Sequence, residues 1–136
     1  MKKSWSDKLA DPTPHVVKPA PIDIAGMTKG EIMLVPTPAL VDRLIRKIPR
    51  GRSVNVRSLR YELARMHGAE VTCPITTGYH LRTVAEAACE RLQQGATVDE
   101  VTPFWRVLDA RTPTTKRISC GAAFVAEQRA KERLVP

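Results

Sequence analysis

The residues of this chain that could do covalent chemistry are three cysteines, and their positions favour reduced thiols. Cys73, Cys89 and Cys120 are odd in number and widely spaced, which is typical of a reducing compartment, so we expect no disulfide. Cys73 precedes Pro74 at the expected start of a helix, where the helix dipole favours a thiolate. Cys73 is therefore the thiol to consider as an alkyl acceptor, whereas Cys89 has the setting of a core residue.

Other catalytic or metal-binding arrangements do not stand out in the sequence. The histidines and cysteines lack the close paired spacing of a structural zinc site; they are His67, Cys73, His80, Cys89 and Cys120. We find no Gly-rich phosphate loop, no acid pair in a credible setting and no Ser-His-Asp arrangement. The sequence thus predicts neither a metal nor a cofactor, and it assigns no catalytic residue.

The balance of charge indicates a polyanionic partner. The 136 residues include 22 Lys and Arg against 14 Asp and Glu, and the net charge of +8 favours nucleic acid or an acidic membrane surface. Two basic blocks, residues 31–68 and 102–136, flank an acidic block at 69–101, although solvated helix faces would give the same pattern. No apolar run approaches a membrane span, and the first residues lack the apolar stretch of a secretory signal. We therefore expect a cytoplasmic protein without membrane contact.

The N-terminal quarter of the chain differs in composition from the rest. Residues 1–30 carry prolines among lysines and small residues, which interrupt helix and leave little apolar material to pack. We expect an extended arm over 1–30 that could drape over a single domain at 31–136. Residues 32–35 could form a short strand, although a buried loop would look the same.

The domain itself shows helical periodicity interrupted by turn residues. Four helices are expected: from 38 to Pro49, from a cap at Asn55 or Ser58 to Gly68, from a cap at Thr76 or Thr77 to about 94, and over 122–134. Residues 104–108 read as a short strand and 111–117 as an exposed basic turn. Three helices followed by a strand and a basic loop predict a mainly α-helical winged helix-turn-helix with a small β wing.

Four short segments share their order and residue types with one known family. Residues 48–51 read Ile-Pro-Arg-Gly, before a helix segment at 58–64 that ends in Leu-Ala; 82–87 read Arg-Thr-Val-Ala-Glu-Ala; 103–107 read Pro-Phe-Trp-Arg-Val; and 119–121 read Ser-Cys-Gly. Over about residues 36–134 the chain thereby resembles the C-terminal, DNA-binding domain of the O6-alkylguanine-DNA alkyltransferases, the methylated-DNA–protein-cysteine methyltransferases. None of these motifs is specific without the others.

This resemblance implies a set of DNA contacts. In the family, the recognition helix enters the minor groove, its arginine enters the base stack, and the damaged guanine rotates into a pocket beside the cysteine. By position that arginine is Arg82, whose guanidinium is planar, always charged and able to stack on bases, although a solvated helix residue is the alternative. The other expected DNA contacts are Thr83, Tyr79, Arg50, Arg52, Arg57, Lys116 and Arg117. The expected lesion pocket comprises Phe104, Trp105, Arg106 and Ser119.

The chain departs from the family where the family does its chemistry. Phe104 stands at the position of the acceptor cysteine and Trp105 at that of the adjacent histidine, so alkyl transfer at that site is chemically impossible. Val56 falls where the family has a tyrosine that presses on the phosphate of the flipped nucleotide. The prediction is a monomeric, non-catalytic, alkyltransferase-like protein that binds double-stranded DNA, alkylated or plain, alongside a repair-protein partner.

Several alternatives stay open at this point. The chain could be a winged-helix regulator or architectural protein that does not read damage, an active alkyltransferase that uses Cys73, or a protein- or RNA-binding module. The solvent accessibility of Phe104 and Trp105 distinguishes a lesion pocket from a core role for these two rings. A lesion pocket requires that at least one ring of Phe104 and Trp105 be partly solvent-accessible, whereas core residues would both be buried.

Overall fold

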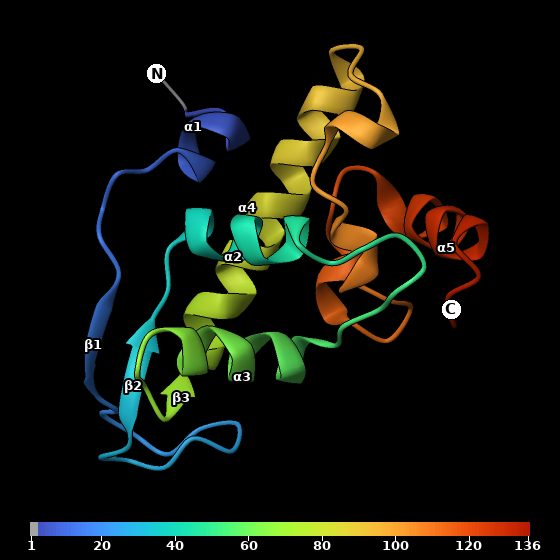
Figure 1. Cartoon of the computed structure of the whole chain (residues 1–136). Coiled ribbons are helices and arrows are strands. Elements are labelled where there is room, and N and C mark those ends of the chain that lie inside the picture. The colour runs from blue at the N-terminus through green and yellow to red at the C-terminus, as the bar shows by residue number, and fades with distance from the viewer. Residues whose placement is uncertain (1–2) are drawn as a thin grey trace.

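A long central helix organises the molecule. The computed structural model describes residues 3–136, and in it α4 (Pro74–Gln93) runs between the other helices (Figure 1). From Leu81 to Cys89 every residue of α4 except Arg82 is buried, as expected for a helix that has packing partners on most sides. Within the described residues, no helix, α4 included, combines the length and apolar character needed to cross a membrane.

The remaining helices pack around α4 and around the short 3₁₀ turns that follow it. They are α1 (Trp5–Leu9), α2 (Pro38–Arg46), α3 (Val56–Met66), η1 (Val98–Glu100), η2 (Phe104–Arg106), η3 (Pro113–Lys116) and α5 (Gly121–Lys131). Both α1 and α2 lie against α4, and α3 contacts α2 and the sheet. The turns η2 and η3 each contact both α4 and α5.

A small three-stranded sheet lies beside the helices, as Figure 1 shows. Strand β2 (Ile32–Val35) is central, with β1 (Val16–Pro19) antiparallel on one side and β3 (Val71–Thr72) parallel on the other. The short strand expected at 32–35 is thereby confirmed. All four residues of β1 are exposed, and Pro19 in that strand suits a sheet edge, where a missing N–H leaves no ladder partner unsatisfied.

Two main clusters of buried side chains divide the core along α4. The first joins α2, α3, β2 and the first half of α4, and its fully buried members include Leu34, Ile45 and Leu63. The second joins the second half of α4 to η2 and α5, and it contains Phe104 and Trp105. The molecule is thus a mixed α/β fold, mainly helical with a small sheet.

The helices expected near 38–48 and 55–68 are confirmed as α2 and α3. Asn55 caps α3, because its side-chain oxygen accepts a hydrogen bond from the Ser58 N–H at 2.8 Å. Gly68 follows with a φ of 67°, a left-handed conformation that a residue with a side chain rarely adopts.

The cap expected for the long helix is wrong. The helix begins at Pro74 with Cys73 at its N-cap, so the two threonines lie in the first turn instead. Thr77 donates its hydroxyl back to the Cys73 carbonyl at 2.7 Å, and Thr76 donates to the Cys73 thiol at 3.2 Å. Proline is favoured at the first helical position because no intrahelical partner awaits its missing N–H there.

Of the extended arm expected over residues 1–30, residues 1–2 lie outside the described part of the chain, and residues 3–30 are not extended throughout. Residues 5–9 form α1, which lies against α4, and β1 pairs with β2. The Glu90 carboxylate holds α1 in place, since it accepts hydrogen bonds from the Trp5 N–H, the Ser6 N–H and the Ser6 hydroxyl. These hydrogen bonds lower the pKa of Glu90.

The β wing is absent from the place where the sequence predicts it. Residues 104–106 form the 3₁₀ turn η2 and residues 113–116 form η3, so neither the strand at 104–108 nor a hairpin is present there. The Phe104 N–H donates to the Thr102 carbonyl and the Leu108 N–H to the Phe104 carbonyl, while the Arg106 carbonyl accepts from the distant Val54 N–H, so the segment forms no strand ladder. The sheet is built instead from residues 16–19, 32–35 and 71–72.

The expectation of no disulfide is wrong as well. Cys89, on α4, and Cys120, at the N-cap of α5, form a disulfide with their Cα atoms 5.6 Å apart. The two residues are 31 positions apart in the sequence, and they meet because Cys89 belongs to the core cluster around Phe104 and Trp105 while Cys120 packs against that cluster. Cys73 is the free cysteine.

Candidate nucleic-acid interface

One exposed basic surface combines residues from α4 and η3. A shallow pocket there is lined by Ile75, Gly78, Tyr79, Arg82, Thr114 and Arg117. With the adjoining Lys116, these residues are called the α4–η3 surface below. The Tyr79 side chain is 72% exposed, and Arg82, Lys116 and Arg117 are exposed as well.

Helix geometry explains the α4 side of this surface. Tyr79 and Arg82 are three residues apart, so they lie on the same face of α4, and Gly78 adds no side chain to fill the space beside them. Thr83 points the other way: it is buried, and its hydroxyl donates to the Tyr79 carbonyl at 3.1 Å. Thr83 is also among the expected DNA contacts, but it does not join the exposed residues of this surface.

The η3 side is held by hydrogen bonds around Asp109. The Asp109 carboxylate accepts hydrogen bonds from the Arg111 and Thr112 N–H groups, and the Thr115 hydroxyl donates to the Asp109 carbonyl at 2.6 Å. Thr115 is buried while the next two residues, Lys116 and Arg117, are exposed. The turn thus presents two adjacent cations from an ordered backbone.

No acidic side chain neutralises these cations. Within residues 3–136, neither an ion pair nor a side-chain hydrogen bond involves Arg82, Lys116 or Arg117. Arg82 instead has its guanidinium carbon 5.4 Å from the centre of the Trp5 ring, and Lys8 approaches the same ring at 4.1 Å. The α4–η3 surface therefore carries uncompensated positive charge with aromatic groups beside it.

Three of the other expected DNA contacts lie outside this surface. Arg50 and Arg52 are exposed on the loop between α2 and α3, where Arg50 donates to the Lys131 carbonyl at 3.4 Å. Arg57 lies on α3 beside the sheet. The structure thus brings together Arg82, Tyr79, Lys116 and Arg117, and it separates the rest.

The expected lesion pocket is not open. Phe104 is 0% and Trp105 2% exposed, and both rings pack against Phe124 within the second core cluster. The two rings also contact each other edge to face, with centroids 5.3 Å apart. Of the two alternatives left open for these rings, the core role is therefore the one that the structure shows, and neither ring is accessible for stacking on an extruded base.

The other two residues of that expected pocket are engaged elsewhere. Arg106 donates to the Glu132 carboxylate at 2.9 Å and to the Ile48 carbonyl at 2.7 Å. Ser119 is exposed, and its N–H donates to the buried Glu86 carboxylate at 2.7 Å. Both contacts tie loops to the core.

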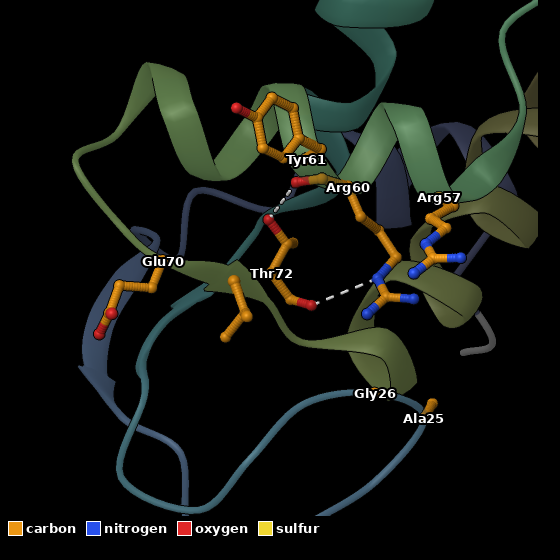
Figure 2. A pocket seen from close by; sticks show the side chains of 8 residues that line it. Ala25, Gly26, Arg57, Arg60, Tyr61, Glu70 and Thr72 are labelled. Carbon is orange, nitrogen blue, oxygen red and sulfur yellow. Dashed lines mark hydrogen bonds between the residues drawn. The ribbon is translucent and has the colours of Figure 1, made fainter.

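A second basic site was not anticipated from the sequence. Figure 2 shows a hollow between α3, β3 and the turn at residues 24–27, into which Arg57 and Arg60 extend from α3. This hollow, called the arginine hollow below, is lined by Ala25, Gly26, Arg57, Arg60, Tyr61, Glu70, Val71 and Thr72. Arg60 follows Arg57 by three residues, a spacing that places both on one helix face and could have indicated the pair.

Cys73, the alternative alkyl acceptor, lies half-buried at the start of α4. Its thiol accepts a hydrogen bond from Thr76, and no histidine or acid among the described residues is hydrogen-bonded to it. Among residues 3–136, His, Cys, Asp and Glu side chains form no group that could hold a metal ion.

Comparison of the chain with family models, with curated proteins and with solved structures finds no match.

Proposed function

We propose that this chain is a non-catalytic protein that binds double-stranded DNA through the α4–η3 surface. The observation that carries the proposal is the set of unneutralised cations, Arg82, Lys116 and Arg117, gathered on one exposed surface from two elements far apart in the sequence. A polyanion with closely spaced phosphates is the partner that such a surface fits. The net charge of +8 adds long-range attraction.

Each side chain has a role in this proposal. The guanidinium groups of Arg82 and Arg117 match phosphate oxygens in a two-pronged geometry, and Lys116 adds a point charge. The Tyr79 hydroxyl is able to donate to a phosphate. Arg82 and Tyr79 lie in the first half of α4, the part of a recognition helix that usually meets the DNA.

The resemblance to the alkyltransferase DNA-binding domain supports this role for Arg82. The proposal includes membership of that family and a helix-turn-helix formed by α3 and α4. Lesion reading does not, because Phe104 and Trp105 are buried. The proposal includes a cytoplasmic location, where the Cys89–Cys120 disulfide would be subject to reduction.

Fluorescence anisotropy with a labelled duplex tests the proposal. Arg82→Ala and Arg117→Ala should each weaken binding about 5- to 10-fold, which corresponds to about 1–1.4 kcal/mol, the usual net contribution of one hydrogen bond. Arg43→Ala is the matched control, because Arg43 is an exposed arginine on α2 outside the α4–η3 surface. Equal losses in all three variants would contradict the proposed surface.

A duplex carrying one O6-methylguanine gives a second comparison. Because both aromatic rings are buried, we expect equal affinity for the modified duplex and its plain twin. Clearly tighter binding to the modified duplex would contradict this expectation and favour lesion sensing through an opened pocket.

A further inference from the structure

We propose that the arginine hollow is a binding site for a phosphate group, held between the guanidinium groups of Arg57 and Arg60 and the backbone turn at Ala25 and Gly26. The site lies apart from the α4–η3 surface and shares no residue with it. The inference therefore stands or falls independently of the function proposed above.

Arg60 is held in place by two contacts with β3. Its Nε donates to the Thr72 carbonyl at 3.4 Å, and the Thr72 hydroxyl donates to the Arg60 carbonyl at 2.6 Å, as Figure 2 shows. Both contacts leave the two Nη groups of Arg60 free, because no hydrogen bond within the described residues engages them. Thr72 is buried, so this support is shielded from water.

Arg57 and Arg60 form a like-charged pair. Burial lowers the pKa of Arg60 most, the Cys73 thiol raises it, and Arg57 lowers it further through repulsion. Arg60 nevertheless keeps its charge at neutral pH, since arginine does not lose its proton in proteins. Two cations kept close together are a cost to the fold that a bound anion would offset.

The acidic groups nearby do not neutralise the pair. The Glu70 side chain lines the hollow, but its carboxylate accepts the Ile32 N–H at 2.9 Å, and Figure 2 shows it directed away from both arginines. Glu62, also on α3, is ion-paired with Arg65. The positive charge of the hollow is therefore uncompensated within the described part of the chain.

The turn opposite the arginines supplies backbone donors. Ile24 and Met27 exchange both of their backbone hydrogen bonds, which leaves Ala25 and Gly26 at the tip with φ angles of 47° and 85°. A left-handed alanine is strained, and such strain is often kept at functional sites. In the described residues the Ala25 and Gly26 N–H groups have no hydrogen-bond partner, so they are available to an anion.

Phosphate fits these donors better than a carboxylate would. Its three or four oxygens are able to accept from two planar guanidinium forks and from backbone N–H groups at once. The group could belong to free inorganic phosphate or to the backbone of a nucleic acid, and the two share the same chemistry at the hollow. Tyr61 points away from the arginines in Figure 2, so we assign it no contact with the phosphate.

Thermal unfolding with inorganic phosphate, at ionic strength held constant with chloride, tests the site. At saturating phosphate the melting temperature of the full chain should rise by about 2–5 °C. Arg57→Gln should abolish the rise without a fold defect, because the Arg57 side chain makes no hydrogen bond in the described structure. Arg60→Gln should abolish it as well.

Arg65→Gln is the control, since Arg65 lies on the same helix but pairs with Glu62. It should keep the phosphate-dependent rise. No rise in the wild-type chain, or an equal rise in Arg57→Gln, would overturn the proposal.

A second arm identifies the source of the phosphate. Duplex affinity that falls in Arg57→Gln, and that free phosphate lowers in the wild type, would assign the hollow to a backbone phosphate. Unchanged duplex affinity, with the thermal response intact, would assign it to free phosphate. Duplex binding by the Arg82 and Arg117 variants is measured separately. The thermal unfolding result can therefore still be interpreted if the DNA proposal fails.

Discussion

Glu132 is the side chain on which three segments of the chain meet. Its carboxylate accepts hydrogen bonds from the Trp105 ring N–H at 2.7 Å, from Arg106 at 2.9 Å and from the Gly51 N–H at 2.8 Å. Burial raises the pKa of Glu132, but the hydrogen bonds from Arg106, Trp105 and Gly51 outweigh burial, so the net pKa is lowered. This carboxylate joins the loop after α2, the η2 turn and the end of α5.

Glu132→Gln should therefore lower the free energy of unfolding at pH 7 by about 3–5 kcal/mol, the usual cost of breaking a buried ion pair. The carboxylate has a lower pKa folded than unfolded, so its stabilisation is present above about pH 4.5 and is lost as the pH falls through the folded value. Urea titrations at pH 7 and near pH 3 should show the difference between wild type and variant shrinking.

The control is Glu127→Gln, because Glu127 forms an exposed pair with Lys131 and should change stability by less than about 1 kcal/mol. A wild-type advantage that stays constant between the two pH values would argue against an ionised, stabilising Glu132.

The resemblance places Phe104 in a lesion pocket, whereas the structure buries it in the core. It is fully buried against Trp105 and Phe124, so Phe104→Ala should lower the free energy of unfolding by about 3–5 kcal/mol. Chemical denaturation measures this directly. A loss below about 1 kcal/mol would indicate that the ring is exposed and would reopen the pocket.

At the level of elements, the disulfide links α4 to α5. It closes a separation of 31 residues, and by loop entropy Cys120→Ser should lower the free energy of unfolding by about 3–4 kcal/mol under oxidising conditions. Adding a reductant should bring wild type and variant close together in a denaturant titration. A wild-type denaturation midpoint that the reductant leaves unchanged would contradict the Cys89–Cys120 disulfide.

The elements that could be predicted from the sequence are those specified by local signals. Helices α2 and α3 are specified by local signals, namely their apolar spacing, the Asn55 cap and Gly68. These signals act over a few residues, so they can be recognised in the sequence. Residues 104–108 have strand-like composition, yet the first three of them fold as the η2 turn because α4 and α5 both pack on Phe104 and Trp105.

Pairings between distant segments were the part that sequence patterns could not supply. Strand β1 depends on β2, and α1 depends on the Glu90 carboxylate some 84 residues later in the chain. The Cys89–Cys120 contact is of the same kind. Each of these contacts forms only between segments that the packed fold brings together, so neither residue spacing nor composition predicts it.

At the scale of the whole molecule, positive charge could be predicted from the sequence but its distribution could not. Of the residues expected on one DNA face, Arg82, Tyr79, Lys116 and Arg117 lie together, whereas Arg50, Arg52 and Arg57 lie elsewhere. Arg57 instead joins Arg60, whose importance depends on the contact of α3 with β3. Helix spacing indicates which residues share a face but not which face remains open.

The salt dependence of duplex binding tests the account most directly. Contacts from Arg82, Lys116 and Arg117 release condensed counterions, so the logarithm of the binding constant should fall with the logarithm of salt concentration with a slope of about −3. The Arg82→Ala/Arg117→Ala double variant should reduce the magnitude of that slope by about 2, while Arg43→Ala should leave it unchanged. A flat response in the wild type, or a double variant with the full wild-type slope, would contradict DNA binding by the α4–η3 surface.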